Sequence, residues 1–159
     1  MSANRKLLRD CIHKFSDVTI GSPNKSLVSS YIAQSNKAIV AMNALSTAKA
    51  DEWIVETSYY AKYFAVSALL AAVGVRSKNH ACTAEFFEYL FGGSYPTLAA
   101  ELKASRGKRV GAIYNATMAG INVKDLVPKT KTFVTEVESI ANGLKVTDIV
   151  LLRSHLSGL

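Results

Sequence analysis

Apolar positions recur at spacings of three and four residues along most of the chain, which is the period of an amphipathic α-helix. One such face runs from Val28 to Ser46, after Pro23, and another from Leu126 to Leu144. Proline at a first helical turn loses no hydrogen bond, so Pro23 is a start signal. No strand-like alternation of useful length is visible. The pattern predicts an all-α fold, an antiparallel helical bundle of five or six helices.

The stretch after Asp51 differs, because apolar residues surround the expected helix on nearly every side until Gly74. A helix that is apolar all round is a central one. The uncharged run from Tyr63 to Val75 is closed by Lys62 and Arg76 and covers thirteen residues. A bilayer span needs about 20 residues. The stretch therefore predicts a core helix rather than a membrane segment.

Turn and cap residues divide the rest of the chain into shorter pieces. Residues 2–15 are expected to form a short basic helix. Asn79 is a candidate cap for a helix through Phe91, and a further helix is expected from Pro96 to about Met118. Asn122 and Thr147 are candidate caps for the last two helices.

The composition fits a single domain over residues 1–159, long enough to bury a core without disulfides or a structural metal. The N-terminus has no apolar stretch followed by small cleavage-site residues, so we expect no secretory signal and a soluble, cytoplasmic protein. Cys11 and Cys82 are too few and too far apart in sequence for a metal cluster or a redox pair. We therefore expect two reduced cysteines.

The chain is basic, with a formal net charge of +7 and an isoelectric point near 9.5. An excess of positive charge suits a polyanionic partner, either nucleic acid or an acidic protein. The densest basic stretch holds Lys103, Arg106, Lys108 and Arg109. Solvated surface charge is the alternative interpretation of Arg106 and Lys108.

Arg109 continues a helix seam of otherwise apolar or small residues that begins at Leu98. An unpaired buried charge costs several kcal/mol, so this arginine needs an anionic partner or an open cleft. The alternative is an arginine bonded to a carboxylate or a helix end. Gly107 and Gly111 lie four residues apart and would allow a second helix or a ligand to approach closely, although a flexible or kinked helix explains them as well.

The segment TSYYAKYFAVSALLAAVGVRSKNHACTAEFFEYLF resembles the signature of a subgroup of the HEPN family. The adjacent Tyr59 and Tyr60, followed by Gly74, Lys78 and His80, fall at the spacing of that family. The likeness covers roughly residues 26–144 and leaves the first 22 residues outside. It implies a helical bundle that usually pairs into a homodimer. Many members are the toxin of a toxin–antitoxin pair whose partner is a small nucleotidyltransferase.

Active members of that family cut RNA without a metal, through an R-x4-6-H motif. Its arginine is thought to hold the scissile phosphate, and its histidine to handle the proton of the ribose 2′-hydroxyl. The corresponding residues here are Arg109 and Tyr114, an R-x4-Y motif that resembles the subgroup. A tyrosine with a pKa near about 10 is a poor general base at neutral pH. The resemblance thus implies weak or absent ribonuclease activity, with Tyr114 as a hydrogen-bond donor or as the hydroxyl that a partner nucleotidylates.

His80 is expected at the start of a helix, where it orders the turn or reaches the cleft of Arg109 from a neighbouring helix. Tyr59, Tyr60 and Tyr63 are expected in the core, with hydroxyls that bond across helices, and a base-stacking platform is the alternative. Metal-ligand spacing is absent from the sequence, and no cofactor is expected. The sequence thus predicts a protein that binds RNA or a nucleotide through a basic groove around Arg109. The alternative is a non-catalytic interaction module that recruits a partner nucleotidyltransferase.

Overall fold

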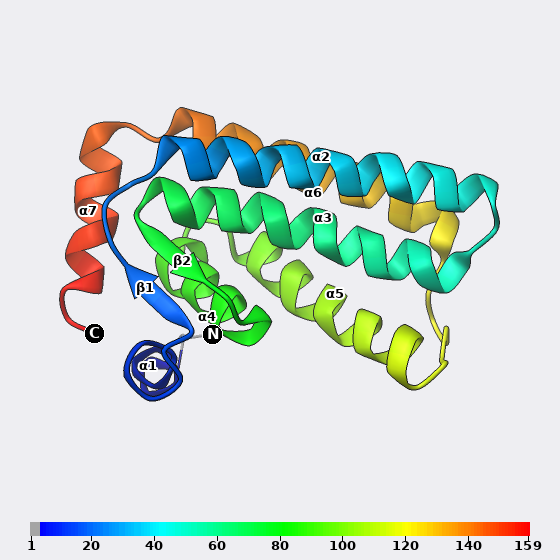
Figure 1. Ribbon diagram of the computed structural model, residues 1–159, viewed down its shortest axis with the longest axis horizontal. Coiled ribbons are helices and arrows are strands. Elements are labelled where there is room, and N and C mark those ends of the chain that lie inside the picture. The colour runs from blue at the N-terminus through cyan, green and yellow to red at the C-terminus, as the bar shows by residue number, and fades with distance from the viewer. Residues whose placement is uncertain (1–3) are drawn as a thin grey trace.

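Helices account for most of residues 4–159, which are the residues that the computed structural model describes (Figure 1). The elements, in chain order, are α1 (Arg5–Arg9), the π-helix η1 (Asp10–Lys14), β1 (Val18–Ile20), α2 (Lys25–Thr47), α3 (Asp51–Ala72), β2 (Val75–Ser77), α4 (His80–Phe91), α5 (Pro96–Tyr114), α6 (Val123–Gly143) and α7 (Val146–Leu156). The predicted all-α helical bundle is confirmed.

Helix α3 lies at the centre of the bundle and contacts α2, α4, α5, α6 and β2. In Figure 1, α2 and α3 run side by side, α5 lies below them, and α7 stands across one end. Most residues of α3 are buried, as its apolar pattern predicts, but Trp53 in its first turns is exposed. Within residues 4–159 no helix is long and apolar enough to cross a bilayer.

Asparagine side chains begin several of the helices. Asn79 Oδ1 accepts hydrogen bonds from the amides of Ala81 and Cys82, and Asn122 Oδ1 accepts one from Lys124. These two predicted caps are confirmed. Asn24, directly after Pro23, caps α2 in the same way. Each side-chain oxygen satisfies a backbone donor that has no partner within the helix.

Two predicted boundaries are wrong. Helix α5 ends at Tyr114, four residues before Met118, and Ala116 then adopts a left-handed φ of 48°. Helix α7 begins at Val146, so Thr147 lies inside it rather than at its cap. The amide of Lys145 instead donates to the Asp148 carboxylate at 2.9 Å, and this acidic residue in the first turn sets the start.

A short antiparallel ribbon joins the N-terminal region to the end of α3. Val18 pairs with Ser77 and Ile20 with Val75. Strands of three residues are too short to produce a readable alternation in the sequence. Gly74 between α3 and β2 has a φ of 87°, and an added Cβ there would collide with the carbonyl oxygen of Gly21. Glycine at this position therefore allows the two segments to meet.

Arg153 of α7 fixes the same junction from the other side. Its Nη1 donates to the carbonyl oxygens of Gly21 at 2.6 Å and of Val73 at 2.9 Å. The bond to Val73 satisfies a carbonyl group at the C-terminal end of α3, where a positive charge is favourable. Three segments that are distant in sequence are thus joined by one side chain.

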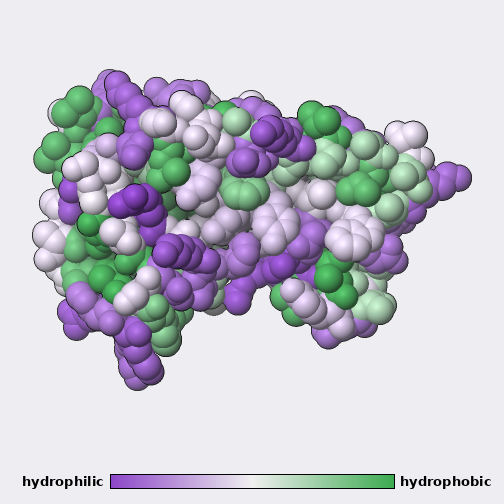
Figure 2. Space-filling view, in the orientation of Figure 1, coloured by the Kyte–Doolittle hydropathy of each residue, from purple (hydrophilic) through white to green (hydrophobic). Residues whose placement is uncertain are grey.

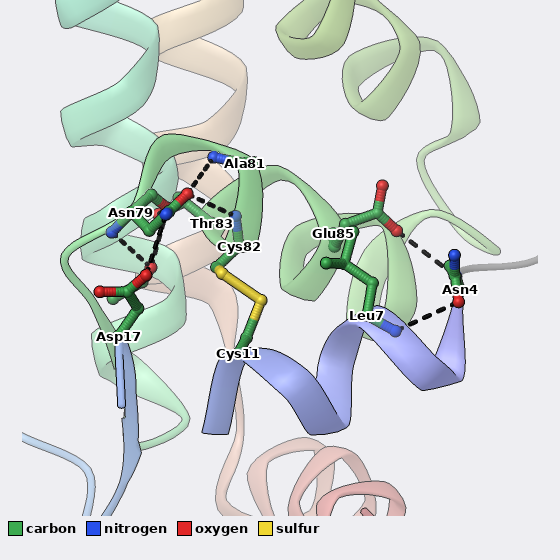
Figure 3. Close-up of a disulfide and its surroundings, with 10 residues drawn as sticks. Asn4, Leu7, Cys11, Asp17, Asn79, Ala81, Cys82, Thr83 and Glu85 are labelled. Atoms are coloured by element: carbon green, nitrogen blue, oxygen red, sulfur yellow. Dashed lines mark hydrogen bonds between the residues drawn. A yellow bond between two sulfur atoms is a disulfide. The ribbon is translucent and has the colours of Figure 1, made fainter. Parts of the chain in front are cut away.

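Cys11 and Cys82 form a disulfide between η1 and α4, so the expectation of two reduced cysteines is wrong (Figure 3). The separation of 71 residues in sequence gave no sign of proximity, because the N-terminal helix folds back on α4. Both cysteines are buried. Disulfides are typical of oxidising compartments and of intracellular proteins of hyperthermophiles. The cysteines therefore no longer support a reducing compartment.

Candidate functional site

Arg109 is held in the third quarter of α5 by a carboxylate from α3. Its Nε donates to both Oε1 and Oε2 of Glu56, each at 3.0 Å. Both side chains are mostly buried. Burial lowers the pKa of Arg109, but the hydrogen bond and the charge of Glu56 outweigh it and raise the pKa overall. The arginine is therefore charged and fixed. Of the interpretations drawn from the sequence, the structure shows the alternative in which Arg109 is bonded to a carboxylate.

Only Nε of Arg109 is used by Glu56. Among residues 4–159, neither Nη1 nor Nη2 donates a hydrogen bond to the protein. A guanidinium offers five donors in a planar fork, so the terminal nitrogens remain available for two oxygens of a ligand. A phosphate or a carboxylate matches this geometry through two parallel hydrogen bonds.

Three tyrosine rings surround this guanidinium. Arg109 Cζ lies 5.4 Å from the ring centroids of both Tyr59 and Tyr60, and 5.9 Å from that of Tyr114. Cations at such distances are attracted by the ring faces. The sequence places Arg109 and Tyr114 on different faces of their helix, so that they converge only in a cleft or across a dimer. In the structure they converge within one chain.

Tyr114 is exposed over 67% of its surface and is therefore not a packed core residue. It is the last residue of α5, where the helix stops and its side chain is no longer confined by a neighbouring turn. Tyr59 and Tyr63 are buried, as expected for core residues. An exposed ring and hydroxyl at the edge of the site suit contact with a ligand or a partner protein.

His80 lies at the start of α4 and reaches the same tyrosines. Its Nδ1 is 2.8 Å from the hydroxyl of Tyr59, and its ring centroid is 4.4 Å from that of Tyr63. Its ring centroid also lies 5.8 Å from that of Tyr60, whose centroid is 5.4 Å from Arg109 Cζ. The structure therefore brings His80 and Arg109 to the same pair of tyrosines, Tyr59 and Tyr60.

The protonation of this histidine follows from its surroundings. Burial lowers the pKa of His80, and the charges of Arg109 and Arg106 lower it further, against the opposing effect of Glu56. Burial also raises the pKa of the Tyr59 hydroxyl, which keeps its proton. A protonated Tyr59 donating to Nδ1 leaves the imidazole proton on Nε2. His80 is then a neutral hydrogen-bond donor at neutral pH.

The other three basic residues of this stretch of α5 differ in their surroundings. Lys103 donates to Glu85 at 2.8 Å and to Glu88 of α4, so carboxylates already occupy it. Arg106 is exposed, and its charge acts on Tyr59 and His80. Lys108 is exposed too, but its charge acts on Lys62, away from His80. Of the three, Arg106 is the one that the structure brings to the Arg109 site.

Two charged residues of α3 were not singled out from the sequence. Glu56 holds Arg109, and Lys62, which is only 2% exposed, donates to Glu101 at 2.7 Å and to Ser105 at 3.0 Å. The pKa of Lys62 is lowered by burial, which Glu101 partly offsets. Their position in the sequence could have identified them, because they are the charged residues of α3 beyond its first turn. A charge inside a helix that is apolar all round requires a partner.

The outline of the molecule is indented between the end that carries α1 and the C-terminal half of α5, with pale and hydrophilic surface in the indentation (Figure 2). A cavity of about 490 Å³ lies elsewhere, between α6, α7 and the end of α4. Its lining includes Leu90, Phe91, Ile140 and Leu152, and its one carboxylate, on Asp148, already caps α7. The convergent charges and the perturbed pKa values are at Arg109 rather than in this cavity, and we place the candidate site there.

Groups of three or more His, Cys, Asp or Glu side chains arranged to hold a metal ion are not found among residues 4–159. No family model, curated protein or solved structure matches the chain.

Proposed function

We propose that this chain binds RNA or a nucleotide by holding a phosphate at Arg109, as a HEPN-like protein of the toxin–antitoxin type. One observation carries the proposal. The guanidinium is oriented by Glu56 through Nε alone, while its terminal nitrogens face no protein acceptor among the described residues. A donor fork that is fixed before a ligand arrives loses little freedom on binding.

The surroundings of the fork suit a nucleotide better than a free anion. Tyr60 and Tyr114 lie within 6 Å of the guanidinium, and Tyr114 is exposed. Aromatic rings stack on any base, at about 1–3 kcal/mol per base. The Nε2–H of His80 and the cation of Arg106 add a donor and a long-range attraction. Together these groups fit a phosphate with a base beside it.

Cleavage of the bound RNA is expected to be weak or absent. A general base needs a pKa near the working pH and a free lone pair. His80 has a lowered pKa, but its Nδ1 is engaged by the Tyr59 hydroxyl, and when this hydroxyl donates, the imidazole proton lies on Nε2. Moving the lone pair to Nε2 requires the Tyr59 bond to reverse. The arrangement therefore favours binding over proton transfer from a ribose hydroxyl.

The experiment is fluorescence anisotropy with a labelled RNA of about four nucleotides, a length typical of small single-strand sites. Arg109→Ala is expected to weaken binding at least about tenfold, which is about 1.4 kcal/mol. Lys108→Ala is the matched control, since it removes an exposed cation from the adjacent position, and it should change the affinity less than about twofold. Tyr114→Phe keeps the ring and should retain most of the affinity.

Equal affinities of wild type and Arg109→Ala would remove the site assignment. Rapid metal-independent cleavage by wild type that is lost in His80→Gln or Tyr114→Phe would show that the site is catalytic. Circular dichroism melts of each variant separate a binding defect from unfolding, because Arg109→Ala leaves Glu56 without its partner.

A second candidate function rests on the exposure of Tyr114. The exposed side chain of Tyr114, next to the guanidinium of Arg109, is accessible to a partner enzyme. In this second function the chain recruits a small nucleotidyltransferase that modifies the Tyr114 hydroxyl. Mass spectrometry after co-expression with such an enzyme tests this. Adenylylation of wild type but not of Tyr114→Phe is the expected result, and modification elsewhere would contradict it.

We also propose a homodimer through this face. Trp53 of α3 and Val110 and Tyr114 of α5 are exposed large side chains on two contacting helices. A Cβ at Gly107 would meet no atom within 4 Å, so this position leaves room for a second copy. Light scattering at micromolar concentration measures the molecular mass. A monomeric mass for the wild type, unchanged in Gly107→Leu, would contradict the dimer.

A further inference from the structure

The positive charge of the chain is concentrated in its first 49 residues. They hold seven of the 19 Lys and Arg residues but only two of the 12 Asp and Glu residues. They therefore carry a net +5 of the total +7. By contrast, Lys62, Lys103 and Arg109 further along the chain are already paired with carboxylates. The unpaired positive field is not centred on α5, where the sequence is densest in basic residues.

Much of this charge lies on α1, η1 and the next residue, Arg5–Phe15, which we name the N-terminal basic segment. Its apolar side, with Leu8 and Cys11, is buried, while Arg5, Lys6, Arg9 and Lys14 are exposed. Phe15 is 47% exposed, with Lys14 Nζ 5.5 Å from its ring centroid. Exposed cations beside an exposed ring are the groups with which proteins hold single-stranded nucleic acid.

This segment is fixed to the rest of the molecule rather than hanging from it. The Cys11–Cys82 disulfide ties it to the first turn of α4, and Asn79 Nδ2 donates to Asp17 Oδ2 at 2.9 Å just beyond it (Figure 3). At its beginning, the amide of Asn4 donates to Glu85 of α4 at 3.4 Å. The exposed cations are therefore presented in a defined position relative to α4.

The turn that receives the segment leads directly to the Arg109 site. The amide of Lys78 donates to the carbonyl oxygen of Asp17 at 2.8 Å, so Lys78 lies next to the end of the segment. Its side chain is exposed. His80, two residues later, already belongs to the tyrosine cluster around Arg109. Exposed cations thus continue from Lys14 through Lys78 towards Arg106.

We propose that the N-terminal basic segment is a second RNA-binding surface, continuous with the Arg109 site through Lys78, so that a longer single strand is held along both. This inference rests on the proposed function for the Arg109 end of the path. The path has exposed rings at both ends, Phe15 and Tyr114, and exposed cations between them. Cations between two exposed rings match a single strand that offers phosphates along its length and unpaired bases at either end.

The experiment compares labelled RNAs of about four and about 16 nucleotides, the range of single-strand site sizes. The path variant carries Arg9→Ala, Lys14→Ala and Lys78→Ala. It should bind the longer RNA at least about tenfold more weakly, with a salt slope smaller by about two, from about 0.7 per phosphate contact for single strands. The shorter RNA should bind within about twofold of wild type.

The matched control removes three exposed lysines elsewhere, through Lys25→Ala, Lys37→Ala and Lys49→Ala on and next to α2. It has the same net charge as the path variant and should bind both RNAs nearly as wild type does. Equal losses in the control and the path variant would show a general field rather than a path, and would overturn the proposal. So would a path variant that binds the longer RNA as wild type does.

The two proposals fail separately in this design. If Arg109→Ala loses the short RNA while the path variant keeps the long one, only the second surface is wrong. If the path variant loses the long RNA while Arg109→Ala behaves as wild type, only the Arg109 site is wrong. Flotation with vesicles of phosphatidylserine and phosphatidylcholine tests whether the segment binds an anionic lipid surface instead of RNA. Vesicle binding that depends on Arg9, Lys14 and Lys78, without RNA binding that does, would overturn the proposal in favour of a lipid surface.

Discussion

Each of the two charged side chains in the body of α3 is held by a partner from α5. Glu56 pairs with Arg109, and Lys62 pairs with Glu101, so the two ion pairs have opposite polarity. Sliding one helix along the other would bring like charges together in a largely buried layer, at a cost of several kcal/mol. The two pairs therefore fix the register between α3 and α5, and with it the position of Arg109 against the tyrosines.

Removing Glu101 and removing Lys62 are expected to change the free energy of unfolding by different amounts. Glu101→Ala leaves a buried ammonium without its carboxylate and should lower the free energy of unfolding by about 2 kcal/mol, less than the 3–5 of a fully buried pair. The reduction reflects Glu101, which is 35% exposed and screened by water. Lys62→Met leaves only this half-exposed carboxylate and should be nearly neutral. Urea unfolding measures both, and a larger loss in Lys62→Met would contradict the argument.

The stability of the folded chain should also depend on the protonation of His80. Burial and the charges of Arg109 and Arg106 lower its pKa when folded, whereas an unfolded histidine titrates near about 6.5. The unfolded chain therefore binds the proton at higher pH, and stability falls as the pH drops below about 6.5. Urea unfolding at about pH 7.5 and 5.5 should show a smaller loss in His80→Gln than in wild type. Equal losses would show that His80 does not contribute.

At the scale of elements, the N-terminal helices α1 and η1 depend on α4 for their place. They are only five residues each, shorter than isolated helices that persist in water. Their buried side chains, Leu8 and Cys11, pack into the main core. The segment is therefore folded by its contacts and its disulfide rather than by local preference.

Removing the disulfide is expected to destabilise the whole fold, because it closes a loop that contains α2 and α3. For a closed loop of 71 residues, the lost freedom of the unfolded chain corresponds to about 4 kcal/mol. Urea unfolding of Cys11→Ser with Cys82→Ser, against wild type without reductant, measures the difference. Alkylation of two thiols in the natively purified, unreduced protein would show that the bond does not form.

At the scale of the whole molecule, the features that follow from a periodic pattern were predicted from the sequence. Contacts between residues that are distant in the sequence were not. The central helix, the Asn79 and Asn122 caps and the bundle follow from the period and from cap residues. The disulfide joins positions that no local pattern connects. Tertiary contacts decided such features, and a single sequence does not display them.

The candidate site was predictable in the same uneven way. Arg109 was visible as a cation in an apolar seam, and His80 as a residue able to reach it. Glu56 was not, since an isolated acid in a helix has many potential partners. The exposure of Tyr114 was not predictable either, because it depends on the end of α5, and the sequence placed that end at about Met118.

The junction at Gly74 also bears on how the chain is made. Gly21, Val73 and Arg153 meet there, yet Arg153 follows the other two by a long stretch of chain. During synthesis, earlier parts of a chain emerge and begin to fold before later ones exist. The ribbon and the end of α3 must therefore wait, with open carbonyl groups, until α7 has left the ribosome. Completion of this fold is accordingly tied to the translation of its last helix.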